Sequence, residues 1–139
     1  MNQPHVCGFD HLTMAKTVWG EARNQGYLGM AAVAWVVKNR ATRGGWWGES
    51  IASVCQKPSQ FSCWNSNDPN RAQLDRVTED TPEYLRAIGI SALVMTDDIA
   101  DPTGGGQYYH TKQIHPAWAD KMIKLCEIGD HVFYKEKGS

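Results

Sequence analysis

Residues Met30–Val37 are all apolar, and this run constrains the fold more than any other feature of the chain. It lies inside a stretch, residues 28–40, whose pattern predicts a helix with apolar side chains around most of its circumference. A helix that is apolar nearly all round is buried by its neighbours in a core. The run is also far shorter than the ~20 residues that a membrane-spanning helix needs. The sequence therefore predicts a central buried helix and no membrane insertion.

Helical patterns flank this central helix. Starting at Asp10, the expected N-cap, apolar residues recur at spacings of three and four until Asn24-Gln25-Gly26 ends the pattern. A Gly/Trp-rich loop at residues 42–48 leads to a short helix expected near residues 50–56. Another helix begins at Thr81-Pro82-Glu83, which supplies an N-cap, a proline at the first helical position and an acid in the first turn. Its apolar stripe is predicted to contain Leu85, Ile88, Ala92 and Met95.

The C-terminal third of the chain predicts a small β element. Short strands are expected at residues 107–111 and 131–134, and a helix is expected at residues 116–127. Residues 58–70 are expected to be irregular, because Pro, Ser, Asn and Asp interrupt them. The sum is an α+β fold that is mostly α. A chain of 139 residues without a linker or repeat is expected to form a single domain over residues 1–139.

The charge of the chain excludes several classes of partner. The net charge is −1 with a pI near 6.5, and no Lys/Arg run occurs, so neither nucleic acid nor an anionic membrane is an expected partner. Residues Met1–His5 lack the basic start and apolar run of a secretory signal, so we expect synthesis in the cytoplasm.

Cysteine and histidine spacing gives no metal signature. None of the four cysteines belongs to a C-x-x-C pair, which disfavours zinc ribbons and thioredoxin-like chemistry. Reduced thiols are the expectation, with a Cys55–Cys63 disulfide across a loop as the alternative. His110 and His115 are five residues apart and no H-E-x-x-H motif occurs, so we expect no metal and no other cofactor. A nucleophilic pair of Cys63 with His110 stays open, although nothing in the local sequence favours it.

Glu21 is the titratable residue whose position is most informative. It falls in the last turn of the first predicted helix, where the negative end of the helix dipole disfavours a carboxylate. The neighbouring buried helix would desolvate it further, and both effects favour the protonated form that a general acid needs. Position alone favours a simpler interpretation, which is an exposed glutamate paired with Arg23 or Lys16.

Two loops combine aromatic rings with hydrogen-bonding groups, a combination suited to gripping a sugar. The first spans residues 60–65 and contains Gln60, Phe61 and Ser62. The second spans residues 104–110, where three glycines precede Tyr108, Tyr109 and His110. Under the alternative interpretation, Phe61 and the tryptophan of the first loop pin it to the core, and the second loop is only a flexible turn into a strand.

Taken together, these segments resemble the family of spore cortex-lytic and cell wall hydrolases (SleB-like) in their order and spacing. The resemblance covers about residues 15–134. The matching segments are Thr17–Asn24, Gly29–Ala34, Lys38-Asn39-Arg40, Pro58–Ser62, Asp101–Gly105 with Tyr109, Pro116–Ala119 and Gly129–Tyr134. Each segment alone is a weak signal, whereas several in the family's order are a specific one.

The resemblance implies a lysozyme-like fold and an enzyme that cleaves peptidoglycan between N-acetylmuramic acid and N-acetylglucosamine. It implies that Glu21, the glutamate of the G-E-A-R motif, is the catalytic acid of a lytic transglycosylase that forms 1,6-anhydro products. No second carboxylate is then required, because a substrate acetamido group can stabilise the developing cation. We expect a monomer without a cofactor.

Substrate contacts are predicted for the two loops. We expect Gln60, Phe61, Ser62, Tyr108, Tyr109 and His110 to belong to the substrate site. Gln60 and Tyr109 are predicted to line the cleft beside Glu21, because an amide suits an acetamido group and a phenol suits a sugar ring. Tyr108 and His110 lie on the opposite side of an alternating strand, so they are expected mostly to pack or to face solvent.

Several alternatives remain at this stage. If one of the candidate partner acids lies across the cleft, hydrolysis with water becomes the outcome; the candidates are Asp68, Asp75, Glu79 and Asp101. A peptidoglycan amidase would need zinc ligands or a Cys/His pair, and a silent glycan-binding module would not need Glu21. A short domain without a wall-binding module resembles a phage endolysin that a holin releases to the wall. A bacterial enzyme reduced to its catalytic domain would look the same.

Overall fold

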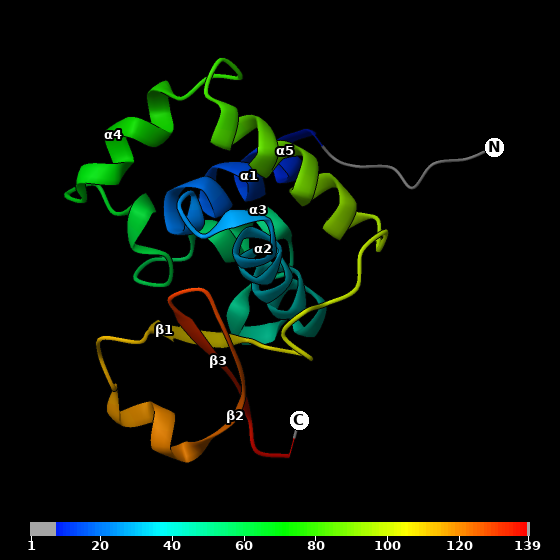
Figure 1. The fold of residues 1–139 in the computed structure, drawn as a ribbon, viewed down its shortest axis with the longest axis vertical. Helices are drawn as coiled ribbons and strands as arrows, with labels where there is room; N and C mark the ends of the chain where they lie inside the picture. Colours follow the sequence, from blue (N-terminus) through cyan, green and yellow to red (C-terminus); the bar gives the residue numbers. More distant parts are fainter. Residues whose placement is uncertain (1–7, 139) are drawn as a thin grey trace.

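The computed structural model describes residues 8–138, in which a helical part lies against a three-stranded sheet (Figure 1). The elements in chain order, with η for 3-10 helices, are α1 (Gly8–Ala22), α2 (Gly26–Arg43), η1 (Gly45–Trp47), α3 (Ile51–Gln56), η2 (Ser62–Trp64), α4 (Pro69–Arg76), α5 (Pro82–Met95), β1 (Tyr108–Thr111), η3 (Ala117–Lys121), β2 (Met122–Ile128) and β3 (His131–Glu136). The sheet is antiparallel with the order β1-β3-β2, so β3 is its central strand. The predicted mostly helical α+β fold is confirmed.

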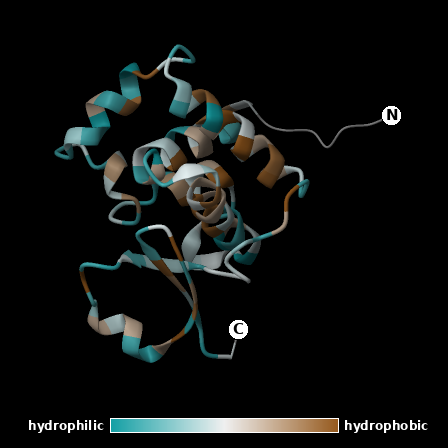
Figure 2. Cartoon of the chain, viewed as in Figure 1, coloured by the Kyte–Doolittle hydropathy of each residue, from teal (hydrophilic) through white to brown (hydrophobic). Residues whose placement is uncertain are grey.

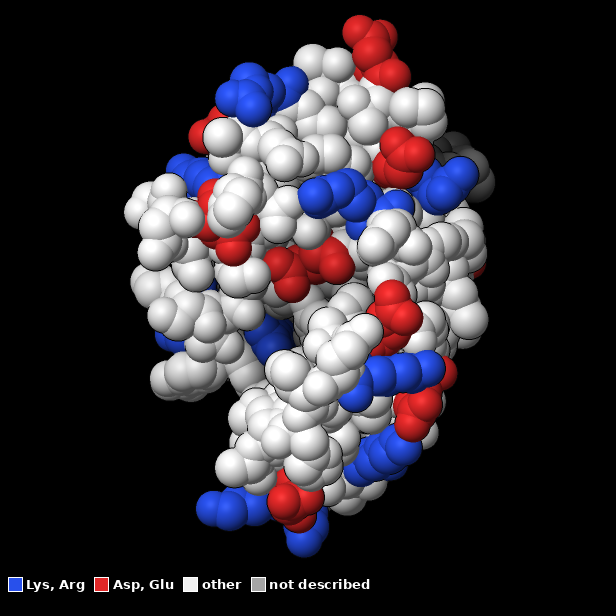
Figure 3. Space-filling model, turned by 60° about the vertical axis from the view of Figure 1, so that its left-hand side comes forward, with Lys and Arg blue, Asp and Glu red and all other residues white. Residues whose placement is uncertain are grey.

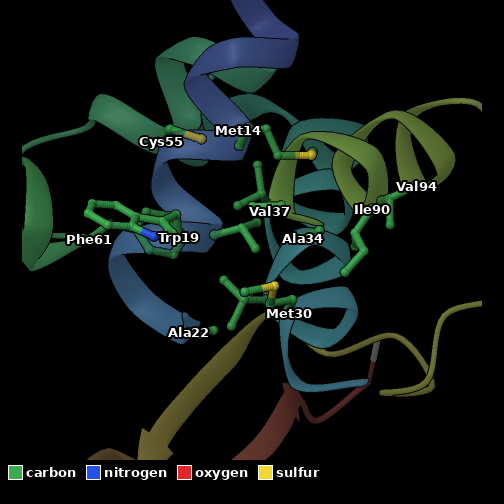
Figure 4. Packing of buried hydrophobic residues seen from close by; sticks show 14 of the residues in the cluster. Met14, Trp19, Ala22, Met30, Ala34, Val37, Cys55, Phe61, Ile90 and Val94 are labelled. Atoms are coloured by element: carbon green, nitrogen blue, oxygen red, sulfur yellow. The ribbon is translucent and has the colours of Figure 1, made fainter. Parts of the chain in front are cut away.

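Helix α2 is the buried centre of the helical part, as its apolar run predicts. It packs against α1, α3 and α5 and also contacts β2. From Met30 to Val37, every residue except Trp35 is buried. Figure 4 shows the side chains of α1, α2 and α5 meeting in this core, among them Met14 and Ile90. Because α2 is covered on several sides, the elements around it hold fixed positions relative to one another.

The sheet is joined to the same helix. The fully buried ring of Phe133, on the central strand, packs against Ala32 and Val36 of α2. This contact places the β1 edge of the sheet near the end of α1, which packs on α2 from another side. None of the helices within residues 8–138 combines the length and the apolar character that crossing a bilayer requires.

Two segments differ from the sequence prediction. Residues 116–127 do not form a helix, because only residues 117–121 are helical and β2 then pairs with β3. The Gly129-Asp130 turn joins β2 and β3 as a hairpin. Such a turn predicts a strand on each side of it, before residue 129 as well as after residue 130. Helix α4 was not expected, although Asp68 caps it by accepting from the Asn70 N–H at 2.8 Å. It is mostly hydrophilic (Figure 2) and buries only Leu74, so it lacks the apolar period of a core helix.

Two details of the helices also require correction. Asp10 is not an N-cap of α1 but lies in its first turn, and its carboxylate accepts from the Ala52 N–H at the start of α3. The predicted apolar stripe of α5 is rotated, because Leu85 is 54% exposed. The residues that α5 buries are Tyr84, Ala87, Ile90, Ser91 and Val94. A helix with apolar residues on several faces does not reveal from sequence which face packs inward.

The described cysteines carry free thiols. Cys55 and Cys63 are both buried and do not form the disulfide considered as an alternative. Burial raises the pKa of the Cys55 thiol to about 12 and also raises the pKa of Cys63, so both stay protonated near neutral pH. Cys7 and the N-terminal residues Met1–His5 lie outside the described residues.

Gly20 provides a test of how tightly α1 packs against η2 and α4. A Cβ at this position would lie 2.9 Å from the Cβ of Cys63 and 3.1 Å from a methyl of Leu74. We expect Gly20→Ala to lower the free energy of unfolding by about 1–3 kcal/mol, because the added methyl overpacks this contact. Gly89→Ala in α5 is the matched control, since nothing lies within 4 Å of a Cβ there. The control should raise stability by about 0.5–1 kcal/mol. Urea unfolding measures both, and equal shifts would contradict the packing described.

Candidate active site

The carboxylate of Glu21 is the point where three distant segments meet. Glu21 lies in the last turn of α1 and is partly exposed. Its Oε1 accepts a hydrogen bond from the Tyr109 hydroxyl of β1 at 2.6 Å. Its Oε2 faces the backbone N–H of Cys63 in η2 at 3.4 Å, a long contact. The structure therefore brings together Glu21 and Tyr109, which the sequence predicts to share a cleft.

The G-E-A-R motif places Glu21 through its neighbours. Gly20 leaves room for Cys63, and Ala22 is buried in the core. Arg23 donates to the carbonyls of Trp19 and Gly20 and to the side chain of Asn70, so it caps the end of α1. Among the described residues, no ion pair joins Glu21 to Arg23 or Lys16, so the simpler interpretation of Glu21 as a surface ion pair is wrong.

Tyr109 reaches Glu21 because of its place on β1. It pairs with Phe133 on the central strand, and its ring also lies edge-on to the ring of His131 at 4.8 Å between centroids. Its pKa lies well above the usual value, first because the phenol is buried and then because the negative charge of Glu21 opposes ionisation. Tyr109 therefore stays protonated near neutral pH and donates a hydrogen bond to Glu21.

The K-N-R motif anchors the segment that leads into β1. The amide of Asn39 donates to the carboxylate of Asp101 and to the carbonyl of Gly106, both at 2.9 Å. Asp101 in turn accepts from the N–H groups of Thr103 and Gly105, which closes the glycine-rich turn. These bonds hold the start of β1 against α2, and they fix where Tyr109 lies.

Arg40 is a site residue to which the sequence assigned no role. It is only 5% exposed, and its Nε donates to the carbonyl of Gln107 at 2.8 Å. Its guanidinium lies 4.2 Å from the ring centre of Trp47 and 4.9 Å from that of Phe61. Burial lowers its pKa to about 10, opposed by the attraction of Tyr109 and, more weakly, of Glu21. Its Nη1 has no hydrogen-bond partner among the described residues. Arg40 is thus a buried cation between η1 and the loop before η2.

The other predicted substrate residues divide into two groups. On the first loop, Phe61 is 1% exposed and lies in the core beneath Arg40, so its ring is not available to a ligand. Ser62 is exposed and Gln60 is partly buried. None of the side-chain hydrogen bonds within residues 8–138 involves the amide of Gln60, so its role beside Glu21 stays a prediction.

Tyr108 and His110 face away from Glu21, as the alternation of β1 predicts. The Tyr108 hydroxyl donates to Glu136 at 3.2 Å, and its ring packs against Trp47 and Trp118. His110 is buried, stacks on the ring of Tyr134 and shares a 2.9 Å hydrogen bond with its hydroxyl. A direct catalytic pairing of His110 with Cys63 is therefore not formed in this structure, since His110 is occupied by Tyr134.

Three of the four candidate partner acids are engaged with other groups, and the fourth, Glu79, is exposed. Asp101 accepts the backbone hydrogen bonds that close the glycine-rich turn, and Asp68 caps α4. Asp75 forms an exposed ion pair with Arg71, and Glu79 lies in a hollow with Tyr84. Within residues 8–138, the hydrogen bonds to the Glu21 carboxylate come from Tyr109 and Cys63 and not from a second acid. The arrangement is that of one carboxylate with hydrogen-bond donors around it.

Glu21 opens to the surface through a hollow of about 240 Å³ lined by Gly20, Glu21, Arg23 and Asn24. Figure 3 shows the surface hollowed between the helical part and the sheet, with acidic side chains at its edge and a basic side chain deep inside. A larger hollow of about 550 Å³ lies beside Asn39 and Gly104. The smaller hollow is favoured as the active site because it contains a carboxylate, that of Glu21. No group of three or more His, Cys, Asp or Glu side chains within the described part of the chain is placed to hold a metal ion.

Comparison with known proteins identifies the family. A family model described as Cell Wall Hydrolase matches residues 24–134. The chain belongs to the cell wall hydrolase family. The resemblance found in the sequence is therefore confirmed, although the matched range begins at Asn24, just after Glu21.

Two relatives in this cell wall hydrolase family are spore cortex-lytic enzymes. The enzyme of Bacillus cereus is 30% identical over 125 residues, which are 88% of this chain and 42% of that enzyme. The enzyme of Halalkalibacterium halodurans is 32% identical over 122 residues, which are 86% of this chain and 33% of that enzyme. The chain thus spans less than half the length of these relatives.

Two solved structures of SleB share the fold. The catalytic domain of the germination-specific lytic transglycosylase SleB from Bacillus anthracis superimposes with a TM-score of 0.75 at 26% identity, covering 94% of this chain and 97% of that chain. The catalytic domain of SleB from Bacillus cereus gives a TM-score of 0.72 at 25% identity, covering 94% of this chain and 93% of that chain. The cell wall hydrolase described here has the fold of the SleB catalytic domain.

Burial of His131 makes the free energy of unfolding of the protein depend on pH. Burial lowers its pKa, partly offset by the charges of Glu21 and Asp130, so the folded state binds a proton less readily than the unfolded state. Stability is therefore expected to fall as the pH falls below the ordinary histidine value. The variant His131→Asn should show a smaller loss of unfolding free energy between pH 7 and pH 5 than the parent protein. Gln113→Asn, at an exposed position without a titratable group, is the control and should leave the slope unchanged. Parallel slopes for parent and His131→Asn in urea unfolding would refute this assignment.

Proposed function

We propose that this cell wall hydrolase cleaves the glycan strand of peptidoglycan between N-acetylmuramic acid and N-acetylglucosamine as a lytic transglycosylase, with Glu21 as both acid and base. The observation that carries the proposal is the Glu21 carboxylate, opening to a surface hollow and held by the Tyr109 hydroxyl at 2.6 Å. Membership of the family and the fold shared with SleB lytic transglycosylase support it.

The proposed reaction uses one carboxylate twice. Protonated Glu21 gives its proton to the glycosidic oxygen, and the bond from that oxygen to C1 of the muramic acid breaks. The carboxylate so formed then takes the proton of the muramic acid C6 hydroxyl, whose oxygen bonds to C1 and closes the 1,6-anhydro ring. Glu21 returns to its protonated form and no water is consumed. The acetamido group of the substrate supports the developing cation, which removes the need for a second acid.

Tyr109 has a positioning role in this scheme. Its phenol is held protonated, so it stabilises the carboxylate at the moment when Glu21 has given up its proton. It also fixes which carboxylate oxygen is left for the substrate, because Oε1 is the acceptor of its hydrogen bond. The N–H of Cys63 lies near the other oxygen, so each oxygen of Glu21 has a hydrogen-bond donor beside it.

Rival functions have less support from the geometry. Hydrolysis with water would place a second carboxylate opposite Glu21, and the four candidate acids are engaged elsewhere or lie elsewhere. A silent glycan-binding module would not need a carboxylate cradled by donors from β1 and η2. The endolysin role, release by a holin and the monomeric state stay predictions.

Replacement of Glu21 tests the proposal. Glu21→Gln keeps the size and a hydrogen-bond acceptor but cannot transfer the proton, so release of dye-labelled fragments from purified cell walls should fall roughly 10²–10⁴-fold. Glu83→Gln, at an exposed position on α5, is the matched control and should keep full activity. Both variants should stay folded, with unfolding temperatures within a few degrees of the parent, since Glu83 contributes only ~0.3–1 kcal/mol as a first-turn acid. A folded Glu21→Gln protein that releases fragments at the parent rate would remove the proposal.

Replacement of Tyr109 tests the hydrogen bond to Glu21 separately. Tyr109→Phe keeps the ring that packs on Phe133 and removes only the hydroxyl, so kcat should fall roughly tenfold to a hundredfold, in line with loss of a hydrogen bond to a charged group. Tyr84→Phe, whose ring packs on Trp19 in the helical core, is the control and should keep its kcat. If the two variants lose activity equally, Tyr109 has no special role beside Glu21.

A further inference from the structure

Residues 44–48 of the Gly/Trp-rich loop bury one tryptophan and expose the other. Trp47 is buried, whereas Trp46 is 65% exposed. Gly44, Gly45 and Gly48 all have positive φ, a conformation that other residues rarely adopt. A Cβ at Gly48 would lie 2.7 Å from the Ser53 hydroxyl, so the loop is also closely packed. The backbone thus maintains an exposed indole in a fixed position.

Trp46 lines a hollow of about 410 Å³ at the edge of the sheet. The other lining residues are Arg43, Gly44, Gly45, Trp47, Tyr108 and Glu136. This volume falls within the range of ~300–1,000 Å³ that is usual for small-ligand sites. The ring centroids of Trp46 and Trp47 are 4.8 Å apart and those of Trp47 and Tyr108 are 5.2 Å apart, both edge-to-face, so the three rings pack on one another along one wall of the hollow.

The hollow is held in shape before any ligand arrives. Arg40 lies behind the floor, 4.2 Å from the Trp47 ring and 5.9 Å from the Tyr108 ring. Glu136 accepts from the Tyr108 hydroxyl and pairs with Arg43, and Arg43 also donates to the side chain of Gln107. Few groups would need to be ordered on binding, which favours affinity.

The chemistry of the hollow suits an uncharged sugar. The exposed indole of Trp46 and the partly exposed phenol of Tyr108 offer apolar surface, and Glu136 and Arg43 supply an acceptor and donors for hydroxyl and acetamido groups. Arg43 and Glu136 neutralise each other. The ammonium of Lys57 lies over a face of Trp46, but Lys57 does not line the hollow. A charged peptide would therefore find no net charge to pair with.

The hollow and Glu21 are connected through β1. Tyr108 lines the hollow, and the next residue, Tyr109, holds the Glu21 carboxylate. Arg40 contacts both the Trp47 ring of the hollow and the Phe61 ring before η2, whose Cys63 N–H lies at Glu21. The hollow and the Glu21 site thus share Arg40 and the Tyr108–Tyr109 segment as neighbours, and a polymeric glycan has further sugars beyond the one bound at Glu21.

We propose that the hollow formed by Trp46, Trp47, Tyr108, Arg43 and Glu136 is a second glycan subsite, which binds an N-acetyl sugar of the peptidoglycan strand away from the bond that is cleaved. This inference rests on the proposed function, since it assigns a further sugar of the same substrate. Trp46 supplies the stacking face, and Arg43 and Glu136 supply hydrogen bonds to the sugar.

Binding in a catalytically inactive background tests the subsite. The probe is peptide-free glycan strands prepared from peptidoglycan, titrated calorimetrically into the Glu21→Gln protein. Adding Trp46→Ala should weaken binding about tenfold, the usual scale for loss of an aromatic anchor, and adding Trp46→Phe should weaken it less. Adding Phe9→Ala is the matched control, because Phe9 is also 65% exposed, and affinity should stay unchanged. Both tryptophan variants keep a buried Trp47, so their folding is not at risk.

Three results would overturn the subsite. The first is equal affinity with Trp46→Ala and with Phe9→Ala. The second is a Glu21→Gln protein that does not bind the strands at millimolar concentration. The third is a Trp46→Ala effect on whole cell walls but not on peptide-free strands, which would assign the hollow to the stem peptide. If instead Glu21→Gln cleaves the strands, the proposed function fails, while the comparison of Trp46→Ala with Phe9→Ala still reports on the hollow.

Discussion

The hydrogen bond from the Tyr109 hydroxyl to the Glu21 carboxylate is the contact on which the site depends. It joins the end of α1 to the edge strand of the sheet, two elements that the chain separates by 88 residues. Both elements pack on α2, so the apolar run in that helix sets the distance between them. A single buried helix thus determines where the acid and its donor meet, and the K-N-R motif on the same helix fixes the start of β1.

The helical core and part of the site follow from the sequence because their signals are local. Glu21 and Tyr109 lie in recognisable motifs, and the alternation of a strand separates Tyr109 from Tyr108 and His110. The sequence does not reveal Arg40 and His131 as site residues, because their surroundings come from segments far away in the chain. Arg40 bonds a backbone carbonyl 67 residues further on, which no local pattern encodes.

Other errors have similar causes. Phe61 was expected at the substrate, but a ring in an irregular loop turns inward when a buried cation and the core offer it contacts. Strand β2 was taken for a helix, because a short apolar stretch fits either period until its pairing partner is known. The exposure of Trp46 in the Gly/Trp-rich loop depends on the positive φ angles of its glycines, which the sequence composition does not give.

The central claim is that one carboxylate, without water as the nucleophile, breaks the glycan strand. The most direct test is digestion of purified peptidoglycan in water enriched in oxygen-18, followed by mass spectrometry of the fragments. A lytic transglycosylase should yield fragments that end in 1,6-anhydro-N-acetylmuramic acid and carry no label at the newly formed end. Fragments with a labelled reducing end on muramic acid would show that water attacks C1, and would contradict the transglycosylase mechanism.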